Sequence, residues 1–448
     1  MSTFTVTNTN NSGAGSLRQA VLDANALTGK DIINFGGLFT DGLAHTISLT
    51  GSSLSITDDL TIEGTNPSLL TIKDDSVSRV FDIGSSVTSA INGVTITNSY
   101  NDNEARRLRG LSNDTISDTI SRLNIFSSLA GGGAISIEGS LTLNNSIITG
   151  NTAEDGGGIS NYGGSLTLNN SIITGNTAKN GGGIINSYFG GTITVNNTTI
   201  SGNTALYGGG IDSFGDTYAV NIITVNNSII TGNTAENGGG INSSSVGFGS
   251  VVSVVSVNNS TISGNTASYG GGINSSGDTI TVNNSTISGN TASYGGGIKS
   301  SGDTITVNNS TISGNTASNG GGINLGYGYG GIFTLINSTI SGNQAHFGGG
   351  IYNEGTLTVG NSIIRHNKAF GMEFGSGQEE SGKGGGIYNY NSRDATVTLD
   401  YSTIACNFDT PQKDSNKVIK PDDLVGKFIT KYDHNRIGNL SGSTFSYS

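Results

Sequence analysis

Hydrophobic and polar residues alternate with a period of two through most of the chain. In one segment Ile280 and Val282 face one side of the backbone, and the threonines beside them face the other. Alternation of β-branched residues over a few positions predicts a short β-strand. A second short strand is expected at Ser285 to Ser288, and a third carries Ile298. Each copy of this segment therefore predicts three short strands separated by Gly and Asn turns.

The three-strand segment recurs along the sequence at intervals of about 25 residues. Longer intervals add their extra residues mostly just after a Gly-Gly-Gly-Ile motif. A fixed period with insertions at one point is typical of a solenoid, and three short strands per copy predict a single-stranded parallel β-helix of roughly fourteen coils. The glycine triplets begin at Gly131, Gly156, Gly181, Gly208, Gly238, Gly270, Gly295, Gly320, Gly348 and Gly384.

One asparagine position in the repeat is expected to form a ladder of side-chain amides. Stacked coils place equivalent residues one above another at about 4.8 Å. Each amide can then bond the next one, as in cross-β stacks. The glycine triplets are expected to turn the backbone tightly and to let successive coils approach closely. The ladder residues are Asn151, Asn176, Asn203, Asn233, Asn265, Asn290, Asn315 and Asn343.

The pairing of Ile287 to Asn290 with Gly295 to Ile298 resembles the repeats of bacterial right-handed parallel β-helix proteins. It is similar to the Phe-x-x-Asn and Gly-Gly-Ala-Ile repeats of polymorphic outer-membrane protein passengers. The opening runs Phe4 to Asn8 and Gly13 to Ala20 resemble the start of secreted or surface β-helix proteins, including cyanobacterial ones. The resemblance covers roughly residues 3 to 407. It implies a right-handed helix and a surface protein, on a fold that pectin lyase-like enzymes also use.

Five segments follow from the repeats. Ser16 to Ala26 predicts an amphipathic helix, which we assign as a cap because an open solenoid end exposes core and unpaired strand edges. Two excursions interrupt the period. The expected segments are an N-terminal strand and capping helix (1–30), irregular first coils (31–98), an insertion (99–130), regular repeats (131–407) with an insertion at 369–383, and a C-terminal cap or assembly arm (408–448).

Composition narrows the classes of partner. The 448 residues include 72 Gly and 3 Pro and carry a net charge of −12, which disfavours nucleic acid as a ligand. The sequence contains no run of 18 apolar residues, so no membrane span is expected. The first residues show neither the basic region nor the apolar region of a secretion signal. The single cysteine, Cys406, follows Ile404 in a strand-like run and is expected to be a buried thiol.

Asp278 and Asp303 are the first candidates for chemistry, although no catalytic residue is assigned. They lie one repeat apart and should stack about 5 Å from each other. That spacing would suit a retaining pair of carboxylates or a bridging calcium ion. Both, however, lie in Gly-Asp-Thr turns, where an aspartate commonly caps its own backbone. No other cofactor or metal is expected.

A second candidate is the pair Arg365 and His366, with His346 about one coil earlier and glutamates in the following loop. Such a set could assemble an acid–base site. An exposed polar stretch beside an insertion is the simpler explanation and is favoured. His45 and His434 are isolated in the sequence and carry no signal.

Two loops and a set of aromatic residues are candidates for binding. Insertions on repeat proteins often carry function. Outward Thr-x-Thr pairs also resemble ice-binding solenoids, although Ile222, Val254 and Ile332 interrupt them. Aromatic residues before glycine triplets predict a broken stripe for sugar stacking or subunit contact, or a cover for a corner. The residues concerned are Arg106, Arg107 and Arg109 in the first loop, Phe370, Met372 and Phe374 in the second, and Tyr207, Tyr269, Tyr294 and Phe347 in the stripe.

These features favour an extracellular or cell-surface structural or adhesive protein. Self-association through ends or flanks, into a filament or sheath, is expected, and a carbohydrate or cell-surface ligand is a further expectation. The alternative is a polysaccharide lyase or glycoside hydrolase that acts in the β-helix groove. Acidic and basic residues clustered on adjacent coils would distinguish the enzyme, and the repeats contain few of them.

Overall fold

The computed structural model describes most of the chain and divides it into two compact units. The first unit is Met1–Ala235 with Val246–Val251, and the second is Glu236–Ser245 with Val252–Ser448. The described residues are 1–75, 79–98, 133–188, 190–215, 220–245, 253–302, 304–326, 331–373, 379–380, 382–390, 395–410, 420–421, 424–425, 427–430, 435–438 and 444–447.

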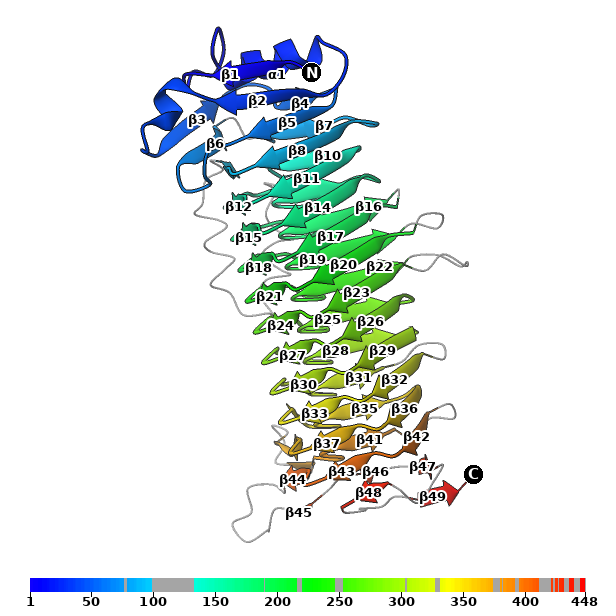
Figure 1. The fold of residues 1–448 in the computed structure, drawn as a ribbon. Helices are drawn as coiled ribbons and strands as arrows, with labels where there is room; N and C mark the ends of the chain where they lie inside the picture. Colours follow the sequence, from blue (N-terminus) through cyan, green and yellow to red (C-terminus); the bar gives the residue numbers. More distant parts are fainter. Residues whose placement is uncertain are drawn as a thin grey trace. The chain divides into compact units, whose positions relative to one another are not determined.

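In each unit the chain is wound as a right-handed parallel β-helix, and Figure 1 shows strands of successive coils lying side by side. Each regular coil contributes three strands to three sheets, which we call A, B and C in chain order. Among the described residues, sheets A, B and C contain 16, 14 and 13 strands, and a turn contains about 27 residues on average. These strand numbers agree with the expected roughly fourteen coils, and the mean coil is slightly longer than the expected 25 residues. Residues added after Gly-Gly-Gly-Ile lengthen several coils without adding a turn.

The first unit stacks strands in parallel in all three sheets. Sheet A contains β1 (Thr3–Val6), β2 (Asp31–Phe35), β5 (Leu60–Glu63), β8 (Thr88–Asn92), β11 (Ser140–Asn144), β14 (Ser165–Asn169), β17 (Thr192–Asn196) and β20 (Ile222–Asn226). Sheet B contains β3 (His45–Leu49), β6 (Leu70–Asp74), β9 (Thr95–Asn98), β12 (Ile147–Thr149), β15 (Ile172–Thr174), β18 (Thr199–Ser201) and β21 (Ile229–Thr231). Sheet C contains β4 (Leu54–Ile56), β7 (Phe81–Ile83), β10 (Ile135–Ile137), β13 (Ile159–Asn161), β16 (Ile184–Tyr188) and β19 (Ile211–Gly215).

The second unit repeats this arrangement. Sheet A contains β23 (Val254–Asn258), β26 (Thr279–Asn283), β29 (Thr304–Asn308), β32 (Ile332–Ile336), β36 (Thr356–Gly360), β42 (Thr396–Asp400), β47 (Lys427–Thr430) and β49 (Thr444–Tyr447). Sheet B contains β24 (Thr261–Ser263), β27 (Thr286–Ser288), β30 (Thr311–Ser313), β33 (Thr339–Ser341), β37 (Ile363–Arg365), β43 (Thr403–Ala405) and β48 (Arg436–Ile437). Sheet C contains β22 (Ile241–Ser245), β25 (Ile273–Ser276), β28 (Ile298–Ser301), β31 (Ile323–Leu325), β35 (Ile351–Asn353), β41 (Ile387–Asn389) and β46 (Leu424–Val425).

The core of each unit is made by the inward residues of the alternating pattern. Ile280 and Val282 of sheet A, Ile287 of sheet B and Ile298 of sheet C all have no exposed surface. Each contacts its equivalent in the next coil, because equivalent strands pair in register. One coil cannot bury these side chains alone, so the apolar core forms only when coils stack.

The N-terminal helix α1 (Leu17–Asn25) packs against β1, β2 and β4 of the first coil. Ser16 caps it, because its Oγ accepts a hydrogen bond of 3.2 Å from the backbone N–H of Gln19. The buried face contains Leu17, Ala20, Val21 and Ala24. A 3-10 helix, η1 (Gly37–Thr40), follows β2.

The last coils of the second unit contain two additional sheets. A fourth sheet, sheet D, forms at the corner between sheets B and C. The segment that was expected as an excursion at 369–383 includes an antiparallel pair of strands at Met372–Glu373 and Glu379–Glu380. The strands concerned are β34 (Gln344–Ala345), β38 (Lys368–Phe370), β44 (Phe408–Thr410) and β45 (Lys420–Pro421) in sheet D, and β39 (Met372–Glu373) and β40 (Glu379–Glu380) in the pair.

Candidate functional site

The asparagines of the repeat form a continuous buried ladder within each unit. Asn290 shows the pattern: its Nδ2 donates to Asn315 Oδ1 at 3.0 Å and to the carbonyl oxygen of Ile262 at 3.0 Å. Its Oδ1 accepts from both the backbone N–H and the Nδ2 of Asn265 at 3.0 Å. All four hydrogen bonds lie away from water, so the amide of Asn290 is fully satisfied and joins its coil to the coils on both sides.

The ladder extends further along the second unit than sequence analysis indicated. Asn343 Nδ2 donates to Asn367 Oδ1, and Asn367 Nδ2 donates to Asn407 Oδ1, both at 2.9 Å. Asn367 and Asn407 were missed because His366 and Cys406 replace the glycine that precedes the other ladder asparagines. The spacing of three residues from an inward isoleucine, Ile364 or Ile404, was the signal that could have identified them.

Two more ladders were missed, both carried by the Asn-Asn-Ser run between sheets A and B. Ser285 is buried at this corner, and its backbone N–H donates to Ser310 Oγ at 3.0 Å. Asn283 faces outward, and its Nδ2 donates to Asn258 Oδ1 at 3.0 Å. Between them Asn284 has a φ of 48°, the left-handed conformation that asparagine tolerates. Each residue of the run therefore has a structural role.

Asp278 accepts hydrogen bonds from another coil, a role that the sequence-based expectation of a capped turn did not include. It is 1% exposed, and its Oδ2 accepts a hydrogen bond of 2.6 Å from Ser243 Oγ. Its Oδ1 accepts a bond of 3.3 Å from the backbone N–H of Ser253. Both donors belong to the preceding coil, so Asp278 joins two coils at the corner between sheets C and A. Asp303 lies outside the described residues, so the predicted carboxylate pair and calcium ion stay predictions.

Arg365 is the last residue of β37, His366 follows it, and both are exposed. His366 and Cys406 hold φ values of 55° and 58° at a corner where the other coils have glycine. The left-handed conformation costs a residue with a Cβ roughly 1–2 kcal/mol. Cys406 is exposed there, which corrects the prediction of a buried thiol. Cys406 lies at the corner that follows β43 and points outward there, so the alternation of inward and outward residues along the strand does not determine its exposure.

His346 is placed at a different edge from His366. Its Nδ1 lies 2.9 Å from the carbonyl oxygen of Phe370, and its ring lies 4.2 Å from the Phe370 ring. Phe370, expected to cover a flank or touch a partner, therefore packs on His346. The remaining residues of the two predicted interaction loops, Arg106, Arg107, Arg109 and Phe374 and the side chain of Met372, lie outside the described part of the structure.

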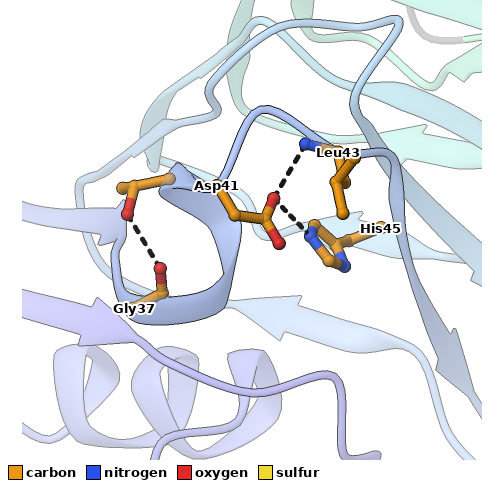
Figure 2. A network of polar contacts seen from close by, with 5 residues as sticks. Gly37, Asp41, Leu43 and His45 are labelled. Atoms are coloured by element: carbon orange, nitrogen blue, oxygen red, sulfur yellow. Dashed lines mark hydrogen bonds and ion pairs between the residues drawn. The ribbon is translucent and has the colours of Figure 1, made fainter.

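His45 is not isolated, contrary to the sequence-based expectation. Its Nε2 lies 2.9 Å from Asp41 Oδ1, which also accepts a hydrogen bond of 2.8 Å from the backbone N–H of Leu43. Figure 2 marks both contacts with dashed lines. The bond from His45, and then that from Leu43, hold the pKa of Asp41 below its usual value. The His45 ring also packs edge-on against Phe39 at 5.6 Å. The pair closes the turn between η1 and β3.

The aromatic residues before the glycine triplets are stacked at one point of the second unit. Tyr269 and Tyr294, joined by a β-bridge, have ring centroids 5.3 Å apart and planes 7° apart. Asn319 follows them in the same column and interrupts the aromatic series before Phe347. The stripe is therefore broken, and Tyr207 of the first unit is another exposed member of the repeat position.

An open groove of about 620 Å³ follows one corner of the first unit, where sheet C turns into sheet A. We call it the corner groove. It extends over successive coils, and small polar residues and glycines dominate its lining. The lining residues are Ser86, Val87, Thr88, Glu138, Gly139, Ser140, Gly163, Gly164, Ser165, Gly190, Gly191, Thr192 and Val220.

Close packing of coils explains the glycines of the corner groove. A Cβ at Gly139 would lie 2.5 Å from the carbonyl oxygen of Val87, and one at Gly164 would lie 2.9 Å from Asn161 Oδ1. Neither position can hold a side chain, so backbone lines the groove there. At the far end the buried Asn221 closes the corner, because its Oδ1 accepts a hydrogen bond of 3.0 Å from the N–H of Gly191.

The polar side chains of the corner groove recur with the coils. Ser140, Ser165 and Thr192 are register partners at the start of successive sheet A strands, so their hydroxyl groups repeat at about 4.8 Å. Glu138 adds an exposed carboxylate beside Ser140. The groove therefore offers hydroxyl, carboxylate and backbone groups in a repeating pattern, which suits a polymer with repeating hydrogen-bonding groups.

Within the described residues, no three His, Cys, Asp or Glu side chains lie close enough together to hold a metal ion. No helix in this part of the chain is long and apolar enough to cross a lipid bilayer.

Residues 337–354 match the repeat of the Chlamydia polymorphic membrane protein. No curated protein matches the sequence. Among solved structures, the chain is similar to the A-module of mannuronan C-5 epimerase AlgE4 from Azotobacter vinelandii, with 11% identity over 99% of this chain and 100% of that chain and a TM-score of 0.46.

Two further solved structures are similar at the same level. Tailspike protein 3 of bacteriophage CBA120 shares 9% identity over 96% of this chain and 57% of its own chain, with a TM-score of 0.45. The catalytic domain of a GH87 α-1,3-glucanase in complex with nigerose shares 12% identity over 98% and 69% of the two chains, with a TM-score of 0.42. At this level of similarity, none of these proteins indicates what the chain binds or does.

Proposed function

We propose that this protein is an extracellular or cell-surface adhesive β-helix that binds a carbohydrate chain in the corner groove. The single observation that carries the proposal is the repeating polar lining of this groove. A polysaccharide presents hydroxyl groups at regular intervals along an extended chain. Hydroxyl groups that recur on successive coils can bond several sugar units at once, and such repeated weak contacts add up to useful affinity.

The lining chemistry favours sugars over other polymers. Ser140, Ser165 and Thr192 both donate and accept hydrogen bonds, as sugar hydroxyl groups do. Glu138 is an acceptor for two sugar hydroxyl groups, and the net charge of −12 opposes a nucleic acid. The match of residues 337–354 to a polymorphic membrane protein repeat supports a surface location.

The test is affinity electrophoresis of the full chain in gels that contain alginate, pectin, dextran or xylan. We expect retardation in at least one gel, and Ser165→Phe should weaken it about tenfold or more by filling the groove. Thr167→Phe is the matched control, because Thr167 faces outward on the same strand but does not line the groove. A bulky residue is tolerated at the Ser165 position, since Ile222 occupies it two coils on.

Retardation in none of the four gels, or equal retardation of both phenylalanine variants, would refute the proposal. New reducing or unsaturated ends in the same incubations would instead support the lyase or hydrolase alternative. Assembly into a filament or sheath stays a prediction, and only dispersed particles in negative-stain micrographs at high protein concentration would count against it.

A further inference from the structure

Four aromatic side chains gather on the outward face of sheet C in the last coils of the second unit. Tyr352 of β35 and Tyr388 of β41 are register partners on adjacent strands, and their ring centroids lie 5.6 Å apart. Tyr390, two residues after Tyr388, lies 6.2 Å from both tyrosine rings. Phe347 lies 5.7 Å from Tyr388. We call these four residues, with Glu354 and Lys383, the aromatic patch.

The scaffold does not require aromatic residues at these positions. In the preceding coils of the same unit, the position of Tyr352 is occupied by Asn324, Lys299 and Asn274. These residues lie on the same type of strand with the same register. At the Tyr352 position, aromatic residues are therefore confined to two adjacent coils, Tyr352 and Tyr388, and their presence calls for an explanation other than the β-helix itself.

Polar groups are interspersed among the rings. The Tyr352 hydroxyl donates a hydrogen bond of 2.6 Å to Glu354 Oε1. Burial, and then this bond, raise the pKa of Tyr352 well above its usual value, so the tyrosine stays a donor. Glu354 has further capacity, because a carboxylate offers about four acceptor sites. At the opposite edge the Lys383 ammonium lies 5.8 Å from the centre of the Phe347 ring.

The patch is also rigid. Strands β35 and β41 lie side by side (Figure 1), and their parallel pairing fixes the backbone under Tyr352 and Tyr388. Tyr352 is 9% exposed and locked by Glu354, whereas Tyr390 is 42% exposed. Aromatic side chains lose little entropy on binding, and an ordered support lowers this loss further. The arrangement is a preformed surface with exposed ring area at Tyr390 and hydrogen-bonding groups at its margin.

From these observations we infer that the aromatic patch is a second carbohydrate site, which binds a pyranose ring of a polysaccharide. One face of a pyranose presents C–H groups, which pack against an aromatic ring, while its equatorial hydroxyl groups point sideways. The rings of the patch match the first feature, and Glu354, Lys383 and the tyrosine hydroxyl groups match the second. A docked protein segment needs a larger exposed apolar area than this patch offers, because Tyr352 is only 9% exposed. The inference does not depend on the corner groove, which lies in the other unit.

Saturation-transfer NMR with the full chain tests the patch, with soluble oligosaccharides of β-1,4-linked glucose, α-1,4-linked galacturonate and β-1,4-linked mannuronate as separate probes. We expect strong transfer to the C–H protons of one sugar face for at least one probe. Tyr390→Ala should weaken binding about tenfold, because the exposed ring contact is lost. Tyr390→Phe, which keeps the ring, should restore most of it.

Tyr401→Ala is the matched control, because Tyr401 is 54% exposed in the same unit, lies between β42 and β43, and belongs neither to the patch nor to the aromatic stripe. The Ser165→Phe variant separates this site from the corner groove: the patch should bind its probe unchanged in that background. The inference is overturned if no probe receives saturation, or if Tyr390→Ala and Tyr401→Ala bind equally. It is also overturned if Tyr390→Ala changes only the concentration dependence of molecular mass, because the patch would then be a contact between copies.

Discussion

Removal of a single ladder amide should destabilise the second unit far more than removal of an outward amide in the same coil. Asn290 has no exposed surface and makes four side-chain hydrogen bonds to Asn265, Asn315 and Ile262. A hydrogen bond contributes about 1 kcal/mol net, so Asn290→Ala should lower the free energy of unfolding by about 4 kcal/mol. The polar atoms that lose their partners stay buried, so this value is a lower bound.

Asn283 provides the control for this prediction. It is the same residue type in the same coil, and its Nδ2 donates to Asn258 Oδ1 at 3.0 Å. It is half-exposed, so water can replace the lost partner, and Asn283→Ala should cost less than about 1 kcal/mol.

The assay combines urea denaturation with hydrogen exchange of peptides that cover residues 280–298. Repeat proteins can unfold locally, so hydrogen exchange shows whether the loss is confined to the coils next to Asn290. If the two variants agree within about 0.5 kcal/mol, and exchange near residue 290 is unchanged, the ladder does not hold the coils together.

Two further predictions concern other parts of the fold. Gly296→Ala should lower the melting temperature strongly, because the new Cβ would lie 2.5 Å from the carbonyl oxygen of Gly321. Gly360→Ala is the control and should be neutral or stabilising, because its Cβ would meet nothing closer than 3.9 Å. Equal melting temperatures of the two variants would contradict this prediction. The pKa of Asp41 is lower in the folded protein than in the unfolded protein, where it is about 3.9, so the ionised carboxylate stabilises the fold at pH values above about 3.9. This stabilisation is lost as the pH falls through the folded pKa. The protection of the Leu43 amide against hydrogen exchange should therefore fall in acid, and Asp41→Asn should abolish this pH dependence. An NMR titration in which Asp41 has its usual pKa would disprove the prediction.

The fold could be predicted from sequence because its determinants are periodic. Inward positions such as Ile280 and Ile287 repeat with the coil, and stacking follows from repetition alone. The role of Asp278 could not be predicted, because its partners, Ser243 and Ser253, become neighbours only through the register of one corner. The exposure of Cys406 was also missed, because it depends on a left-handed backbone at one residue.

The candidate sites were harder to predict than the scaffold. Tyr352 and Tyr390 lie on one surface with Tyr388, which is 36 residues after its register partner Tyr352 because of an insertion in that coil. A pattern based on the regular period does not bring them together. The corner groove is lined by backbone at glycines such as Gly139, where two coils pack too closely for a side chain. The sequence indicates only that these glycines are turn residues.

The near identity of the copies from Thr279 to Ser301 and from Thr304 to Leu325 has a genetic consequence. Unequal recombination between the two DNA segments would add or delete one whole coil. Because each coil bonds only its two neighbours through the same amide and hydroxyl positions, the product would still fold. The length of this protein can therefore change in single steps over evolutionary time, while the sites at its irregular coils are inherited intact.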